Sequence, residues 1–204
     1  MIALIYKPIA YLNIKLSNGS KQKFDLDIKV PLLISLLISL LFLGLNYYDD
    51  SINIFGKSNN LLSPIISFYQ AMPGFYIAAL AAIATFPSAS MNKCMPEPTP
   101  YLLIDQDVED KSSNRDYLSR RRFLCYMFAY LAFISIVFFF IAIGLNFTYS
   151  TVFFEVADWV FLLTYFINCI IVFFIILQSI FITFLGLWYL GHRIHLNDNS
   201  DDEE

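Results

Sequence analysis

The 204-residue chain contains four long apolar runs without Asp, Glu, Lys or Arg, at about residues 31–48, 64–86, 123–145 and 159–190. A helix needs about 20 apolar residues to cross a hydrocarbon core of ~30 Å. Charged residues make up 15% of the chain, against about 25% in soluble domains. The fourth run would reach roughly 48 Å as one helix, so it must tilt, break or project beyond the bilayer. We therefore predict an all-α integral membrane protein with four transmembrane helices.

The distribution of Lys and Arg predicts the orientation of these helices. Twelve of the 13 basic residues lie in segments 1–30, 87–122 and 191–204, and Lys57 is the exception. Segments rich in Lys and Arg stay on the cytoplasmic side of a membrane. We therefore expect both termini in the cytoplasm (N-in/C-in) and a multi-pass location in the plasma membrane, which is the inner membrane of a bacterium.

The N-terminal segment, residues 1–30, carries a strand pattern. Apolar and polar residues alternate from Leu12 to Leu16 and from Phe24 to Val30, on either side of Asn18-Gly19. Alternation around Asn-Gly is typical of a β-hairpin. We predict a small cytoplasmic β-hairpin that lies on another surface, because an isolated hairpin is marginally stable. The transmembrane domain then covers residues 31–190 with the cytoplasmic loop 87–122, and residues 191–204 form an acidic cytoplasmic tail.

Two spans contain residues typical of helix packing. Pro73 predicts a kink in the second span, since proline removes a backbone donor and clashes with the preceding turn. Gly74, Ala78 and Ala82 recur every four residues, a stripe that lets another helix approach closely. Asn168 and Gln178 in the fourth span are placed to form hydrogen bonds between helices, and we favour that role over pore lining.

Three consecutive arginines, Arg120, Arg121 and Arg122, come directly before the third span. They have three interpretations. They can fix the orientation of the span, bind anionic lipid headgroups, or meet an acidic partner. The first role is sufficient to explain them, and contact with headgroups or a partner remains open.

The inventory of reactive residues argues against catalysis. The two histidines, His192 and His195, follow the fourth span, so a Ser or Cys within the spans has no histidine as general base. Phosphate-loop, dinucleotide and zinc-protease motifs are absent from the sequence. We expect a non-enzymatic protein without catalytic, cofactor or metal sites. A net charge of −4 also argues against direct nucleic-acid binding.

Four spans, two cytoplasmic ends and a mainly cytoplasmic extramembrane mass are the layout of a membrane anchor or sensor. This layout resembles the membrane subunits of bacterial anti-phage systems, and among them the membrane component of Kiwa. The resemblance covers the whole chain in length and topology, and no residue is transferred by position. It implies a homo-oligomer that responds to envelope perturbation and holds a cytosolic effector, which in Kiwa is a DNA-binding subunit.

Two other functions fit the same sequence. In an oligomeric ion channel or pore-forming effector, Glu155 and Asp158 would form an acidic ring at the outer mouth of the fourth span. The plainer interpretation of these acids is a favourable interaction with the dipole of a helix N-terminus. A scaffold that binds another integral membrane protein is the third alternative.

Overall fold

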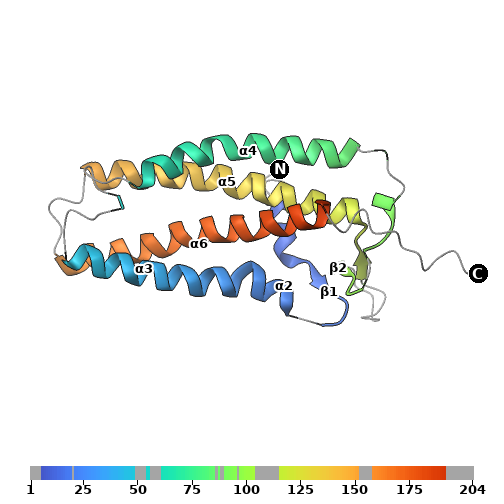
Figure 1. Cartoon of the computed structure of the whole chain (residues 1–204), viewed down its shortest axis with the longest axis horizontal. Helices are drawn as coiled ribbons and strands as arrows, with labels where there is room; N and C mark the ends of the chain where they lie inside the picture. The colour runs from blue at the N-terminus through green and yellow to red at the C-terminus, as the bar shows by residue number, and fades with distance from the viewer. Residues whose placement is uncertain are drawn as a thin grey trace, which may run out of the picture.

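The structure is a computed structural model of the whole chain, and it describes residues 6–19, 21–48, 54–55, 61–85, 87, 90–95, 97–103, 115–151 and 158–191. Four long helices run side by side along the molecule (Figure 1). The first begins as α2 (Gln22–Phe24), continues through the π-helix η2 (Asp25–Lys29) and becomes α3 (Val30–Tyr48). The others are α4 (Leu62–Thr85), α5 (Arg120–Thr151) and α6 (Asp158–Gly191).

All four helices are long and apolar enough to cross a membrane, and they cover the four predicted apolar runs. The first span is extended at its N-terminus by α2 and η2, back to Gln22. The fourth span is one unbroken helix of 34 residues. At ~1.5 Å per residue this helix reaches about 51 Å, well beyond a hydrocarbon core of ~30 Å.

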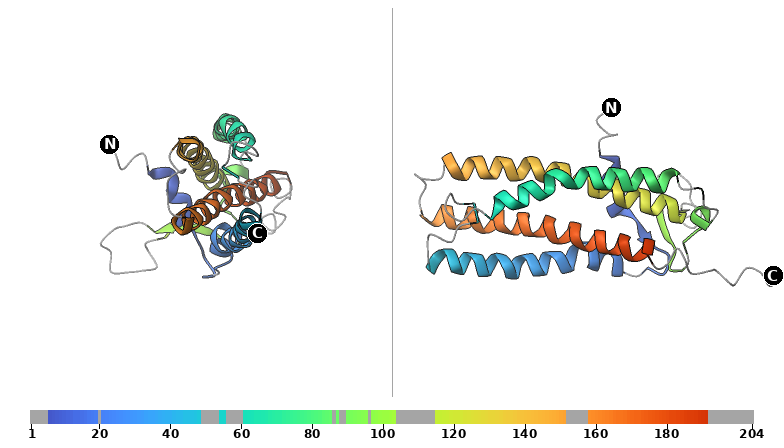
Figure 2. Two further views of the ribbon diagram at one scale, coloured as in Figure 1. Left: turned by 90° about the vertical axis from the view of Figure 1, so that its left-hand side faces the viewer. Right: turned by 45° about the horizontal axis from the view of Figure 1, so that its top comes forward.

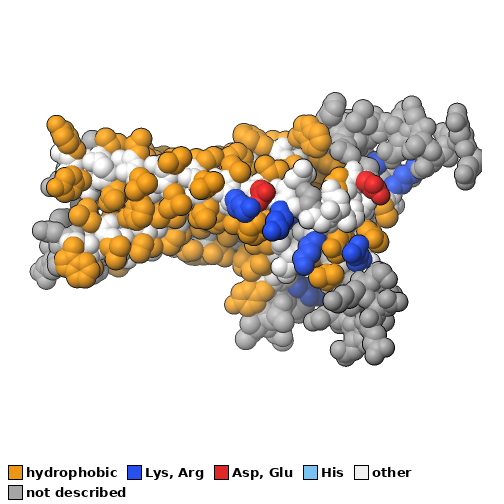
Figure 3. Space-filling model, turned by 90° about the horizontal axis from the view of Figure 1, so that it is seen from below, with side chains coloured by type: hydrophobic (Ala, Val, Ile, Leu, Met, Phe, Trp, Pro, Cys, Tyr) orange, Lys and Arg blue, Asp and Glu red, His pale blue; other side chains and the backbone are white. Residues whose placement is uncertain are grey.

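The helices pack as two pairs. α4 lies against α5, α3 lies against α6, and the contact between α5 and α6 joins the pairs (Figure 2). The outward faces are rich in exposed apolar side chains, such as Leu37, Phe75 and Phe140, each more than 60% exposed. Figure 3 shows hydrophobic side chains covering the narrow part of the molecule on the face seen from below. An apolar surface of this kind suits a lipid solvent, and the backbone N–H and C=O groups in the interior of each helix bond to one another.

A small antiparallel sheet lies near one end of the bundle. Its strands are β1 (Lys15–Leu16), β2 (Pro100–Leu103) and β3 (Arg115–Tyr117), in the order β1-β2-β3. Lys15 is paired with Tyr101, and Tyr101 is paired with Tyr117. The N-terminal segment therefore pairs with the loop between α4 and α5.

The small sheet includes the N-terminal segment, but the predicted β-hairpin was wrong. Residues 22–30 are helical, residues 7–13 form a 3-10 helix, and only Lys15–Leu16 is a strand, paired with β2. The physical reason is the spacing of the charged residues between the apolar ones. Lys23 and Asp27, and likewise Asp25 and Lys29, form ion pairs between positions i and i+4. This spacing brings side chains together on a helix and not on a strand. Asn18-Gly19 still forms a turn, with Gly19 at a φ of 67°, where glycine has no steric penalty.

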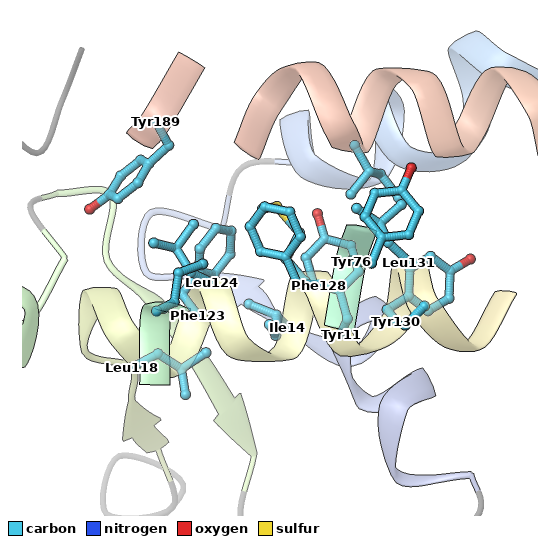
Figure 4. Packing of buried hydrophobic residues seen from close by; sticks show 14 of the residues in the cluster. Tyr11, Ile14, Tyr76, Leu118, Phe123, Leu124, Phe128, Tyr130, Leu131 and Tyr189 are labelled. Carbon is cyan, nitrogen blue, oxygen red and sulfur yellow. The ribbon is translucent and has the colours of Figure 1, made fainter. Parts of the chain in front are cut away.

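A unit of short helices and strands forms around the N-terminal part of α5. We call it the basal module: η1 (Lys7–Asn13), η3 (Ser90–Asn92) and the three strands. Its core contains Tyr11, Ile14 and Met91 from the module, which pack with Leu124 and Met127 of α5. Figure 4 shows Tyr11 and Ile14 beside α5, with Tyr189 of α6 reaching the same cluster. The module is thus a folded unit built on the ends of two helices.

Candidate functional site

A buried ion pair stands at the start of the first span. The ammonium nitrogen of Lys23 lies 2.6 Å from Oδ2 of Asp27, and the two side chains are 10% and 4% exposed. The π-helix η2 contains Asp27, and π-turns occur frequently at functional positions. A buried ion pair needs further hydrogen bonds to offset the loss of hydration, and both partners of this pair have them.

Tyr11 of η1 covers the ion pair. Its hydroxyl donates to Oδ1 of Asp27 over 3.5 Å, and the Lys23 ammonium donates to the Tyr11 carbonyl over 3.0 Å. The ammonium also lies 4.0 Å from the centre of the tyrosine ring, in a cation–π contact. Tyr11 is fully buried. Burial, and then the charge of Asp27, raise the pKa of its hydroxyl well above the ordinary value, so the group stays a hydrogen-bond donor.

Two further helices contribute to the same network. The Gln178 amide of α6 donates to the main-chain carbonyl of Asp27 over 3.0 Å. The Tyr130 hydroxyl of α5 donates to the Gln178 side-chain carbonyl over 2.8 Å. The rings of Tyr11 and Tyr130 stack with centroids 5.5 Å apart. We call these five residues the polar network; it connects η1, the first span, α5 and α6.

Two hollows adjoin the polar network. An apolar cavity of about 190 Å³ is lined by residues of the first span, the loop before β2 and the end of α6, including Asp27 and Trp188. A larger groove of about 780 Å³ lies between η1, β1, α2 and β2, and we call it the basal groove. Ligand pockets generally have volumes of about 300–1,000 Å³, so the basal groove is the one of binding-site size.

The small-residue stripe faces away from the rest of the chain. Gly74, Ala78 and Ala82 are all exposed, and a Cβ atom added at Gly74 would meet nothing within 4 Å. Gly186 of α6 does lie at a helix contact, since an added Cβ would collide with Met127 of α5.

Pro73 lies inside α4, which bends along its length (Figure 2). That Pro73 causes the bend stays a prediction.

Asn168 and Gln178 both form contacts between helices. The Asn168 amide of α6 donates to the Tyr149 hydroxyl of α5 over 3.0 Å. Another polar residue of the fourth span, Thr183, shares a hydrogen bond of 2.8 Å with Tyr76 of α4. The side chains of Asn168, Gln178 and Thr183 form hydrogen bonds with tyrosines of the neighbouring helices. This arrangement favours helix packing as their role.

The three arginines differ in their surroundings. Arg120 is buried at 3% exposure. Arg121 donates to the carbonyl of Ala84 over 2.9 Å, close to the end of α4, where cations interact well with the helix dipole. Arg122 forms a bidentate pair with Asp116 of β3, at 3.0 and 2.6 Å. Arg121 and Arg122 thus tie α5 to α4 and to the sheet, and their contact with headgroups or a partner stays a prediction.

Sequence reasoning missed Tyr11, Lys23 and Asp27. The available signal was the spacing of four between Lys23 and Asp27, which suits a helical ion pair. The prediction instead followed the apolar alternation of Phe24 to Val30.

The described part of the chain does not include several residues named in the sequence analysis: His192, His195, Glu155 and the acidic tail. Asp158 is the first residue of α6. Within the described part of the chain, no group of three or more His, Cys, Asp or Glu is placed to hold a metal ion.

Comparison with known proteins gives no relative: no protein-family model, no curated protein and no solved structure matches this chain.

Proposed function

We propose that this chain is a non-enzymatic, multi-pass membrane subunit that anchors a cytosolic protein through its basal module. The observation that carries this proposal is the sheet that joins residues 15–16 to residues 100–103 and 115–117, directly before the start of α5. A chain that needed only to span the bilayer would not require three separate segments folded into one module. The resemblance in size and topology to anti-phage membrane subunits supports a role in bacterial defence, with a DNA-binding effector as partner.

Exposed apolar side chains on the module support a protein contact. Leu103 is 55% exposed and Tyr117 is 46% exposed. Tyr6, the residue directly before η1, is 58% exposed. Apolar groups at an exposed site outside the bilayer mark interaction surfaces when they gather together. Leu103 and Tyr117 belong to the adjacent strands β2 and β3. A partner that covers them gains apolar burial in addition to its polar contacts.

The polar network supports a sensing role for the same subunit. Tyr11 belongs to the basal module, whereas Asp27 and Gln178 belong to the first and fourth spans. Mismatch between helix length and bilayer thickness costs fractions of a kcal/mol per Å. A change in thickness that tilts one span against the other therefore acts on the hydrogen bonds that hold η1. In a homo-oligomer the contributions of several subunits add and shift a two-state equilibrium.

The distribution of basic residues supports the orientation in which the module meets the cytosol. Four basic residues belong to the module or directly follow one of its elements: Lys7, Lys15, Lys93 and Arg115. Lys21 directly precedes α2. By the positive-inside rule this end stays in the cytoplasm, so both termini are inside and the protein resides in the plasma membrane.

A channel is the alternative that the first experiment must separate. Its support would be a polar path between helices, but three polar residues of α6, Asn168, Gln178 and Thr183, are engaged in packing contacts. An anchor requires a cytosolic partner, and a channel requires only copies of itself. The composition of the native complex therefore distinguishes the two functions.

The test is a pull-down of the tagged chain from native membranes in mild detergent, with partners identified by mass spectrometry. We expect a stoichiometric cytosolic protein, lost from the double variant Leu103→Ser, Tyr117→Ser. The matched control, Tyr47→Ser with Tyr48→Ser, removes two side chains that are 81% and 94% exposed, at the opposite end of α3 from Val30. Recovery of the chain alone from wild-type membranes would contradict the anchor, and ion flux from liposomes would then support the channel.

A further inference from the structure

The basal groove has a lining that is both apolar and basic. Its walls include Leu12 of η1, Phe24 of α2 and Leu103 of β2, and Phe24 and Leu103 are at least half exposed. Lys15 and Lys21 contribute the charge, and both side chains are exposed. No acidic residue is among the described residues that line it. Figure 3 shows Lys and Arg gathering on the wide part of the molecule, away from the apolar bundle.

The positive charge of the groove is not neutralised within the described chain. Lys23 is held by Asp27, but neither Lys15 nor Lys21 has an ion-pair partner among the described residues. Arg115 adds a further cation beside the groove, because its guanidinium lies 4.9 Å from the ring centre of Tyr101, which lines the groove. A ligand that complements this surface must carry negative charge and also bury apolar groups.

A groove of about 780 Å³ with apolar walls is larger than one lipid phosphate requires. Its apolar residues come from two sides, with Leu12 on η1 and Leu103 on β2, so an elongated ligand can contact both. Amphipathic peptides bind in this manner, with apolar anchors in a groove and charges at its rim. Opposite charges at the rim mainly raise the association rate and fix the register.

We propose that the basal groove binds an acidic, amphipathic segment of the cytosolic partner. The carboxylates of that segment pair with Lys15 and Lys21, and its aliphatic or aromatic side chains pack against Leu12, Phe24 and Leu103. This inference rests on the proposed anchoring function and specifies the chemistry of the partner.

The direct test is fluorescence anisotropy with the full chain in nanodiscs of zwitterionic lipid. The probe is a labelled peptide of alternating acidic and Leu or Phe residues. We expect Lys15→Glu and Lys21→Glu each to weaken binding by about threefold to tenfold, as expected for pairs at an exposed rim. The matched control is Lys7→Glu, which changes the net charge equally at an exposed residue outside the groove lining. Its affinity should equal that of the wild type.

Three results would overturn the proposal. Equal weakening by Lys7→Glu would show a response to net charge alone. Absence of peptide binding by the wild type would exclude an acidic segment as the occupant. Binding of vesicles rich in phosphatidylglycerol, with competition against the peptide, would assign the groove to lipid headgroups. A charge swap guards against misfolding: the double variant Lys15→Glu, Lys21→Glu should bind a peptide whose acidic residues are replaced by lysine.

The native pull-down separates failure of the groove from failure of the anchor. If the wild type captures a cytosolic protein and the Lys15→Glu, Lys21→Glu variant captures it equally, the anchor stands and the groove is not the docking site. If the wild type captures none, the anchor itself fails. Support requires that the acidic peptide displaces the captured protein and that the double variant loses it.

Discussion

The Gln178 amide donates to the main-chain carbonyl of Asp27 over 3.0 Å, although the two residues are 151 positions apart in the chain. This bond connects the fourth span to the π-turn at the base of the first. Asp27 in turn accepts from Tyr11, so the same contact leads into the basal module. The polar network is therefore one of the links between the spans and the module, beside the Arg122–Asp116 pair, and substitutions there measure its strength.

Replacing Gln178 with methionine should destabilise the protein by about 1–3 kcal/mol, because the Asp27 carbonyl and the Tyr130 hydroxyl lose their partner in a buried site. The measurement is thermal unfolding in detergent, followed by tryptophan fluorescence. Gln70→Met is the matched control, since Gln70 is exposed on α4. Equal melting temperatures for the two variants would contradict a structural role of the Gln178 hydrogen bonds.

Removing one partner of the buried ion pair should cost more than removing both. We expect Lys23→Met or Asp27→Leu alone to destabilise by about 3–5 kcal/mol, and the double variant to lie much closer to the wild type. The pair of Asp25 and Lys29 has the same spacing, but its side chains are 43% and 53% exposed. Asp25→Asn should therefore cost less than about 1 kcal/mol. A double variant whose loss equals the sum of the single losses would show that the two side chains are not coupled.

Only part of this fold could be predicted from the sequence. The four spans were predictable because a charge-free run of sufficient length has few alternatives in a membrane protein. The helical start of the first span was not, because Phe24, Leu26, Ile28 and Val30 satisfy a strand pattern equally well. The i to i+4 spacing of Lys23 and Asp27 was the local signal for a helix. The long-range pairing of Lys15 with Tyr101 has no such local signal.

The candidate site was predictable only in part. The amide of Gln178 was a natural candidate for contacts between helices, but its acceptor is a main-chain group, and sequence does not reveal such an acceptor. The stripe of Gly74, Ala78 and Ala82 was recognisable in the sequence, but the sequence does not show that it faces away from the other helices of the chain. Both faces of a membrane helix are apolar, because lipid tails are as apolar as a protein interior.

The exposed stripe makes a prediction for the homo-oligomer. If copies associate through α4, Gly74→Leu should shift the complex to monomers in multi-angle light scattering without lowering its melting temperature, because Gly74 is exposed and an added Cβ atom meets nothing within 4 Å. The control is Gly44→Leu on α3, a second exposed glycine with nothing within 4 Å of an added Cβ. An unchanged mass for Gly74→Leu would exclude the stripe as the contact.

The ion pair between Asp116 and Arg122 predicts a small dependence of stability on pH. The hydrogen bonds from Arg122 hold the pKa of Asp116 below its ordinary value, which is about 3.9 in an unfolded chain. The stabilisation is therefore complete above that ordinary value and is lost as the pH falls through the lowered pKa. Asp116→Asn should cost less than about 1 kcal/mol at neutral pH, since the pair is partly exposed. The difference from the wild type should vanish in strong acid; a difference that persists there would contradict the ion pair as its cause.

Site-specific photocrosslinking in living cells tests the central claim most directly, namely that the basal module holds a cytosolic protein. A benzophenone amino acid replaces Leu103 on β2 in one variant and Tyr48 at the far end of α3 in another, both positions being exposed. We predict that irradiation yields one predominant adduct with a soluble protein from position 103 and none with that protein from position 48. Adducts with copies of the chain alone, or the same soluble protein from both positions, would contradict the account.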